Sequence, residues 1–298
     1  MSDTTGTPNA TDSTDEPRTV TLDDERRVSY ATYGDPDGTP VVFLHGTPGS
    51  RRLGALFDAA ATQSGVCLVA PDRPGFGASS PWSDRTLDDT AAFIAPVLDD
   101  AGVDAAPLVG FSGGGPHALA MAATEPSRVD GVSLVASAVP PSVESDPPRS
   151  RRLVAALAAR TPRLLGGALR LQTAIAARAS PAFVASQYTA DERQVPADVA
   201  ETVKRDFVEA LDAGASGAVT EFALLSEPWV DLLDDVACPV HIRHGDADAT
   251  VPVEGARRLH ERLSESRLTV LDDADHLATL RRSRAAVLDA CAGAPETR

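Results

Sequence analysis

A serine held between glycines is the residue of this chain best suited to covalent chemistry. The segment Gly110-Phe111-Ser112-Gly113-Gly114 follows a short apolar run and precedes an alanine-rich stretch. A serine on a sharp turn from strand to helix needs small neighbours, because a side chain at Gly110 or Gly114 would collide with adjoining backbone. Such a turn lifts the hydroxyl above the sheet, so we predict Ser112 to be a nucleophile. A phosphate-binding loop fits less well, since no Lys or Ser/Thr follows the glycines.

A serine hydroxyl needs a histidine as its base, and the chain contains six histidines. His276 alone follows the last predicted strand and precedes a predicted helix, at the edge where the active sites of parallel sheets lie. We therefore predict His276 as the base. The other five histidines are predicted to have different roles. His45 would shape a loop, and His117 would be structural. A position in a strand is predicted for His241, a position at the end of that strand for His244, and a helix surface for His260.

The acid that orients the base is expected in the segment Gly-Asp-Ala-Asp-Ala-Thr-Val-Pro, residues 245–252. Asp248 would lie at the tip of this loop, whereas Asp246 is predicted to brace the loop through backbone amides. The alternative position, after the apolar segment 129–137, offers no carboxylate until Glu144. The lack of a carboxylate at this alternative position favours Asp248 as the third member of a Ser-His-Asp triad.

Alternating strands and helices are needed to bring these three residues together. After two short alternating segments, apolar runs typical of buried strands recur along the chain and are separated by helical patterns. This order predicts the α/β class, with a mostly parallel central sheet flanked by helices. The predicted strands are 41–46, 66–72, 107–112, 129–137, 239–245 and 267–273, and the predicted helices are 87–101, 115–125, 254–263 and 277–290.

The pattern changes between residues 140 and 227, which are helical in character, rich in Ala, Leu and Arg, and interrupted by prolines. An all-helical insertion between two strands suggests a lid over the carboxyl edge of the sheet. We therefore divide the chain into a tail (1–17), a core (18–139 and 228–298) and a helical lid (140–227). The aromatic residues assigned to this region suit either an apolar substrate group or packing of the lid itself: Phe183, Tyr188, Phe207, Phe222 and Trp229.

The charge of the chain is strongly acidic. There are 43 acidic and 27 basic residues, a formal net charge of −16, and Lys204 is the one lysine. Counterion release from phosphates needs clustered cations, so nucleic acid and anionic membranes are disfavoured as partners. The acidity suits solubility, and an acidic, lysine-poor chain also resembles the proteins of salt-loving archaea, in which salt screens self-repulsion.

The cysteines and the absence of long apolar segments predict a cytoplasmic protein. Cys67, Cys238 and Cys291 are odd in number and lack metal-ligand spacing, which fits a reduced compartment. The polar start has no apolar stretch like that of a signal peptide. The sequence contains no run of about 18 apolar residues, so no transmembrane helix is predicted.

Five segments together carry a family resemblance: HGTPGS, DRPGFGAS, GFSGGGPHAL, HGDADATVP and DADHLATL. In their order and spacing they resemble the α/β-hydrolase superfamily, over about residues 18 to 295. The resemblance implies that the Thr47 and Gly113 backbone N–H groups form an oxyanion hole. It implies no metal or organic cofactor. The segment DRPGFG resembles a loop that shapes the pocket, and it also suits a simple tight turn.

Two residues depart from the family pattern. Asp275 precedes the predicted base where relatives usually have a small residue, and a nearby carboxylate would favour protonated His276. A third glycine, Gly115, follows the nucleophile segment and is interpreted as loosening or close helix packing.

These residues predict hydrolysis of a small-molecule ester, lactone, thioester or amide through an acyl-enzyme. A carboxylic-ester hydrolase acting on a small to medium apolar substrate is the main hypothesis. One alternative is a proline-releasing aminopeptidase, whose lid carboxylates would bind a free amino terminus. Glu201, Glu209 and Glu221 are candidates for that role. The other alternative is a relative that binds a ligand without turnover.

Overall fold

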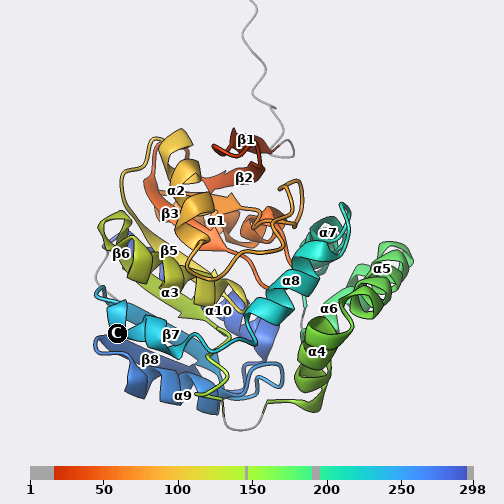
Figure 1. Ribbon diagram of the computed structural model, residues 1–298. Helices are drawn as coiled ribbons and strands as arrows, with labels where there is room; N and C mark the ends of the chain where they lie inside the picture. Colours follow the sequence, from red (N-terminus) through yellow and green to blue (C-terminus); the bar gives the residue numbers. More distant parts are fainter. Residues whose placement is uncertain (1–16, 145–146, 190–194, 294–298) are drawn as a thin grey trace, which may run out of the picture.

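An eight-stranded sheet forms the centre of the protein (Figure 1). The computed structural model describes residues 17–144, 147–189 and 195–293, so residues 1–16 of the predicted tail lie outside it. The strand order is β1-β2-β4-β3-β5-β6-β7-β8; β2 pairs antiparallel with β1 and β4, and the other pairs are parallel. The predicted fold class is thus confirmed. The strands are β1 (Arg18–Thr21), β2 (Arg27–Gly34), β3 (Thr39–Leu44), β4 (Val66–Pro71), β5 (Ala106–Phe111), β6 (Val129–Val135), β7 (Val240–Gly245) and β8 (Ser266–Leu271).

Helices cover both faces of the sheet, which explains why its inner strands are almost wholly apolar. On one face, α2 (Thr90–Asp100), α3 (Gly114–Thr124) and α9 (Val253–Arg262) bury Phe93, Leu119 and Leu259 in one core cluster. On the other face, α10 (His276–Cys291) packs with α1 (Asp58–Gln63) and the 3₁₀ helix η1 (Arg51–Phe57), and this second cluster includes Phe57 and Leu280. Two short 3₁₀ helices, η2 (Pro126–Arg128) and η4 (Val230–Asp235), complete the core.

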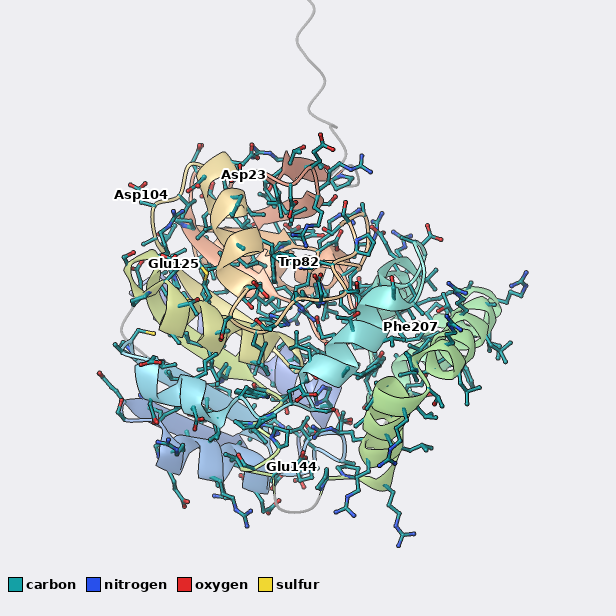
Figure 2. All side chains as sticks on the ribbon, viewed as in Figure 1. Asp23, Trp82, Asp104, Glu125, Glu144 and Phe207 are labelled. Carbon is teal, nitrogen blue, oxygen red and sulfur yellow. The ribbon has the colours of Figure 1, made fainter. Side chains whose placement is uncertain are left out.

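The insertion, residues 140–227, leaves the sheet after β6 and returns before β7. Its described part contains α4 (Arg149–Arg160), α5 (Pro162–Arg178), α6 (Pro181–Ala185), α7 (Ala197–Ala210) and α8 (Ser216–Leu224), and no strand. These helices share their own apolar cluster, in which Phe207 of α7 lies where α7 meets α5 (Figure 2). Figure 1 shows α7 and α8 against the sheet, with α4 to α6 outside them. No helix of the described residues is both long and apolar enough to cross a membrane.

Candidate active site

Ser112 lies on a strained turn between β5 and α3. Its φ angle is +50°, in the left-handed region that non-glycine residues rarely adopt. The turn is held by backbone bonds from the Ser112 N–H to the Val135 carbonyl (3.0 Å) and from the Ala138 N–H to the Ser112 carbonyl (2.9 Å). Because β6 and the segment that follows it hold both sides of the turn, the surrounding structure maintains the strained conformation.

The glycines around Ser112 are required by close packing. A Cβ at Gly110 would lie 2.6 Å from the Gly115 Cα, and one at Gly114 would lie 2.1 Å from the Leu44 carbonyl oxygen. The predicted collisions at Gly110 and Gly114 are therefore confirmed. A Cβ at Gly115 would lie 1.9 Å from the Ser137 Oγ, so this third glycine allows close helix packing.

Asp248 and His276 form a buried hydrogen-bonded pair at the carboxyl ends of β7 and β8. The His276 Nδ1 lies 2.7 Å from the Asp248 Oδ2, and the Asp248 Oδ1 accepts hydrogen bonds from the backbone of Thr250 and Val251. Burial alone would raise the pKa of Asp248, but its interactions with His276, His244 and the Val251 N–H hold that pKa well below its usual value. Asp248 is thus an ionised, fixed acceptor for the imidazole.

The His276 ring lies against the strand that carries Ser112. Its centroid is 4.9 Å from the ring centroid of Phe111, the residue preceding Ser112. His276 itself is 2% exposed. The structure therefore brings Ser112, Asp248 and His276 to one region of the carboxyl edge, from the ends of three strands of the same sheet.

The backbone of Thr47 lies close to Gly113, the residue that follows Ser112. The Thr47 nitrogen lies 3.4 Å from the position that a Cβ would take on Gly113. Neither the Thr47 nor the Gly113 N–H donates to a protein acceptor within the described part of the chain. Both N–H groups are therefore available to a group bound beside Ser112.

A buried charge cluster, which the sequence analysis missed, holds the Thr47 loop in place. The fully buried Arg73 donates through its Nη2 to the Gly46 carbonyl (3.0 Å) and the Thr47 Oγ1 (3.1 Å). Its Nε lies 3.1 Å from both carboxylate oxygens of Glu221, which is also fully buried, on α8. Thr47 Oγ1 donates to Glu221 as well. We name Arg73, Arg85, His117 and Glu221 the buried charge cluster.

Glu221 is the centre of this cluster. Arg85 Nη2 donates to the Glu221 Oε2 at 2.7 Å, and the His117 Nε2 lies 3.4 Å from the same oxygen. Burial alone would raise the pKa of Glu221, but the charges of Arg73 and Arg85 and the hydrogen bond with His117 hold that pKa well below its usual value. One helix of the insertion, α8, is therefore joined to the Thr47 loop by a carboxylate that stays ionised.

A second carboxylate of the insertion binds the same loop. Asp206, on α7, accepts hydrogen bonds through its Oδ1 from the Ser50 N–H (2.6 Å) and Ser50 Oγ (2.9 Å). Burial raises the pKa of Asp206 to about 7, although the two bonds from Ser50 oppose the rise. Thus α7 and α8 each fix one end of the segment 47–50.

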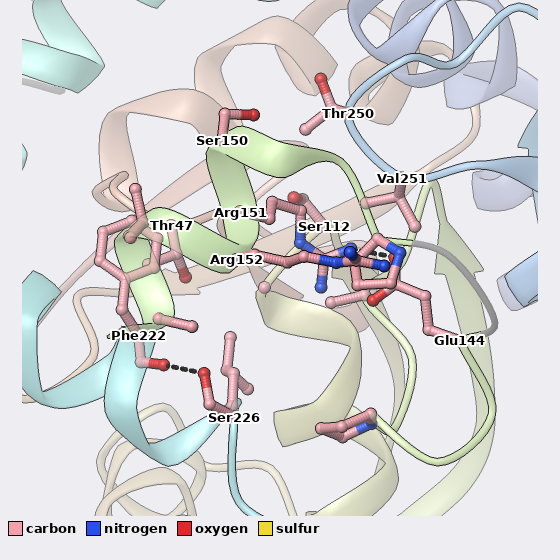
Figure 3. Close-up of a pocket in the computed structure, with 17 residues that line it drawn as sticks. Thr47, Ser112, Glu144, Ser150, Arg151, Arg152, Phe222, Ser226, Thr250 and Val251 are labelled. Carbon is pink, nitrogen blue, oxygen red and sulfur yellow. Dashed lines mark hydrogen bonds and ion pairs between the residues drawn. The ribbon is translucent and has the colours of Figure 1, made fainter. Parts of the chain in front are cut away.

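A cavity of about 380 Å³ opens above Ser112 (Figure 3). Ser112, Thr47 and Gly113 line it from the core, and Arg151 and Arg152 of α4 line it from the insertion. The Arg151 Nη1 is 2.5 Å from the Glu144 Oε1, an ion pair marked in Figure 3. Most of the remaining lining is apolar: Ala138, Pro141, Pro147, Val154, Ala155, Phe222, Leu225 and Val251.

Three of the other histidines have structural contacts that agree with the positions predicted for them. The His45 Nδ1 lies 2.8 Å from the Gly46 carbonyl oxygen and its Nε2 accepts from the Arg73 N–H, so His45 shapes its loop. His117 contacts Thr90 and Glu221, and burial lowers the pKa of His117 to about 4. The His244 Nε2 donates to the Val251 carbonyl beside the acid loop.

Three other predictions need correction or completion. The bracing predicted for Asp246 is performed by Asp248 itself, because Asp246 is exposed and makes no side-chain hydrogen bond to the described residues. Asp275 caps α10: its Oδ1 accepts from the Ala278 N–H at 2.8 Å, which gives this departure from the family pattern a structural reason. DRPGFG does not line the cavity; its Arg73 supports the Thr47 loop instead.

The aromatic residues of the insertion mostly serve packing. Phe222 alone among those predicted lines the cavity. Tyr188 and Phe207 belong to apolar clusters, and Phe183 lies on the surface. Trp229, which was predicted with them, lies just after the insertion and packs in the core of the sheet domain.

Comparison with known families agrees with the fold. Residues 39–282 match the family described as alpha/beta hydrolase fold, and the protein belongs to this family. Among solved structures, a bromoperoxidase from Bacillus anthracis superposes with a TM-score of 0.72, at 22% identity over 92% of this chain and 98% of that chain. An enol-lactonase from Burkholderia xenovorans LB400 gives 0.69, at 20% identity over 91% and 98%. At these identities the likeness shows the fold alone.

Curated relatives match over shorter stretches. The chain is 40% identical over 110 residues to a dihydrolipoyllysine-residue acetyltransferase component of an acetoin cleaving system from Cupriavidus necator, over 37% of this chain and 29% of the relative. It is 35% identical over 130 residues to a non-heme chloroperoxidase from Streptomyces lividans (43% and 47%). It is 36% identical over 114 residues to a proline iminopeptidase from Neisseria gonorrhoeae (36% and 36%). The chain thus spans less than half the length of each.

Proposed function

We propose that the protein is a serine hydrolase that cleaves an ester or related acyl bond of a small to medium apolar substrate. The observation that carries the proposal is the buried Asp248–His276 hydrogen bond beside the Ser112 turn. The cavity above Ser112 gives a substrate access to this arrangement. Esterase and lactonase neighbours of the same fold support the class of reaction.

In the proposed mechanism, Asp248 holds the His276 Nδ1–H, so the His276 Nε2 is free to take the proton of Ser112. The Ser112 Oγ attacks the carbonyl carbon, and the N–H groups of Thr47 and Gly113 stabilise the oxyanion. His276 then gives the proton to the leaving alcohol, which leaves an acyl-enzyme. Water activated by His276 releases the acid and restores Ser112.

The insertion acts in this proposal as the lid that sets substrate size. A cavity of about 380 Å³ with mainly apolar walls favours short or medium acyl and alcohol groups.

A proline-releasing aminopeptidase receives less support. Its amino-terminus site would need available carboxylates, but Glu201 pairs with Arg205, Glu209 with Arg51 and Glu221 with Arg73. None of the three lines the cavity. We therefore expect no hydrolysis of proline p-nitroanilide under conditions in which esters are cleaved.

Hydrolysis of p-nitrophenyl esters of graded chain length tests the proposal. Ser112→Ala should lower kcat by at least about 10⁴-fold. Ser226→Ala is the matched control, because Ser226 also lines the cavity but donates to the Phe222 carbonyl in the last turn of the preceding helix, α8. A folded wild-type protein that neither hydrolyses esters nor reacts with a fluorophosphonate at Ser112 would instead be a ligand-binding relative.

A further inference from the structure

The exposed apolar side chains of this protein are gathered on one part of its surface. Among the described residues, every large hydrophobic side chain that is exposed lies in α4, α5 or α6, and these side chains are between 52% and 64% exposed. Large apolar side chains left exposed on neighbouring helices are a feature of interaction sites. The residues are Leu153, Leu164, Leu171, Ile175 and Phe183.

The same helices reverse the charge of the protein. Residues 147–190 contain no Asp or Glu but seven arginines, although the whole chain carries a net charge of −16. All but the half-buried Arg151 are exposed. The arginines are Arg149, Arg151, Arg152, Arg160, Arg163, Arg170 and Arg178.

The exposed apolar residues and the arginines occupy different sides of α5. Leu164, Leu171 and Ile175 share one side, because residues seven and eleven positions apart return to nearly the same angle at about 100° per residue. Arg163 and Arg170 each precede a leucine of this stripe, so they lie about 100° around the helix from it. The stripe is bordered by cations along its length.

The inner side of α5 is already occupied. Leu165 and Leu169 are buried in the cluster shared with Phe207, so α5 is apolar on two sides, and only one of them packs against the protein. In Figure 1, α4 and α5 lie at the outer edge of the molecule, and Figure 2 shows nitrogen-tipped side chains projecting outward from them. We call the outer surface of α4 to α6 the basic face.

We propose that the basic face docks the protein on an anionic lipid bilayer. Helices with an exposed apolar stripe and arginines beside it lie in the plane of the bilayer interface, with the apolar side chains in the acyl boundary and the cations at the headgroups. The long arginine side chains can reach the headgroups while their stems stay in apolar contact.

A second copy of this chain is the competing occupant, since its body is also acidic. The bilayer is favoured because the apolar residues extend along the outer side of α5 and onto α4 and α6, instead of forming one compact patch. A protein partner would need a long apolar groove to match this extended stripe. A bilayer accepts it without a complementary shape.

The position of α4 gives docking a consequence for the site. Leu153 is exposed on α4, while its neighbours Arg152, Val154 and Ala155 line the cavity above Ser112. The basic face therefore adjoins the wall of the cavity. The acidic remainder of the chain opposes docking only weakly beyond about 8 Å at physiological salt.

Flotation with vesicles tests the inference. The probe is a vesicle of phosphatidylcholine and phosphatidylglycerol in equal parts, compared with pure phosphatidylcholine, in dilute buffer. The Ser112→Ala protein is used as the parent, so the result does not depend on the proposed hydrolysis. We expect it to float with the anionic vesicles and stay soluble with the neutral ones.

Two double variants test separately the charged and the apolar contributions to vesicle binding. Arg163→Gln/Arg170→Gln should weaken vesicle binding about thirty-fold, and Leu164→Ser/Leu171→Ser should weaken it at least tenfold. All four side chains are exposed, so folding is expected to persist, and circular dichroism checks it. Arg257→Gln/Arg258→Gln, which removes two exposed arginines of α9, should leave binding unchanged.

Three results would overturn the inference. The parent protein could stay soluble with anionic vesicles, or the α9 control could lose binding as strongly as the α5 variant, which would indicate net charge alone. Sedimentation could instead show a dimer that Arg163→Gln/Arg170→Gln dissociates, with no vesicle binding. In that case the basic face would bind a second copy of this chain.

Discussion

Gly113 and Thr47 lie closer together than a side chain on Gly113 would permit. A Cβ there would be 2.1 Å from the Thr47 Oγ1, a distance that forces the oxyanion loop to move. Gly113→Ala should therefore displace one of the two proposed donors. We expect kcat for p-nitrophenyl esters to fall about 100- to 1,000-fold, with a smaller change in KM.

Gly131→Ala is the control for this prediction. Its Cβ would meet only the Pro239 carbonyl oxygen, at 3.5 Å, which is an ordinary contact. The control should retain wild-type kcat. Equal kcat in Gly113→Ala and the wild type would exclude the Gly113 N–H from the oxyanion hole.

The sequence placed single residues well where the signal was local. Ser112, Asp248 and His276 each lie in a short segment that ends a strand, so their common location follows from the α/β order. The buried charge cluster was missed because Arg73 and Glu221 are 148 positions apart and neither has a motif that names the other. The one available signal was Glu221 itself, an acidic residue in an otherwise apolar part of α8.

At the scale of elements, Glu221 links α8 to the loop that carries Thr47. Glu221→Gln keeps the side-chain shape but removes the charge that neutralises Arg73 and Arg85. Breaking a buried charge pair in this way costs about 3–5 kcal/mol of stability. Because the oxyanion loop loses its anchor, we also expect kcat to fall by up to about 100-fold with KM nearly unchanged.

Thermal unfolding and ester kinetics measured on the same samples test this link. Glu201→Gln removes an equal charge from α7, where the side chain is exposed and pairs with Arg205, and should alter neither quantity. A destabilised Glu221→Gln protein with wild-type kcat would show that the cluster supports the fold without positioning Thr47.

Asp206 makes the docking of α7 dependent on pH. The pKa of Asp206 is raised to about 7 in the folded protein, against about 3.9 in an unfolded chain. The folded state then binds the proton more tightly, so the stabilising contribution is complete below about pH 4 and is lost as the pH rises through about 7. Asp206→Asn is neutral at every pH and keeps the oxygen that accepts from Ser50.

The melting temperature of Asp206→Asn relative to the wild type should therefore increase between pH 5 and pH 8. Asp198→Asn, an exposed change on the same helix, should show no such pH-dependent difference. If the difference in melting temperature between Asp206→Asn and the wild type were the same at pH 5 and pH 8, Asp206 would not titrate in this range.

Elements were predictable to within a few residues, and the differences have local causes. The helix predicted for 87–101 is observed as Thr90–Asp100. The helix predicted from Leu277 begins at His276, because the Asp275 side chain caps it one residue earlier. The contacts of α7 and α8 with the segment 47–50 were not predictable, since periodicity shows that a helix has an apolar side but not which loop it meets.

At the scale of the whole molecule, the average charge concealed an uneven distribution. A net charge of −16 predicted repulsion from anionic membranes, yet seven arginines without any acid occupy residues 147–190. The remainder of the chain is correspondingly more acidic than the average suggests. The overall composition therefore predicted that the acidic body of the molecule repels anionic membranes, but it did not predict the positive charge of the basic face.

This division predicts that salt acts in opposite directions on stability and on docking. The acidic body repels itself in dilute buffer, and molar KCl shortens the screening length from about 10 Å to about 3 Å. The melting temperature should therefore rise from dilute buffer to molar KCl, whereas flotation with anionic vesicles should fall. Choline chloride at the same ionic strength separates screening from specific potassium binding. A melting temperature that does not change with salt would contradict adaptation to high salt, because the self-repulsion would then be too weak to need screening.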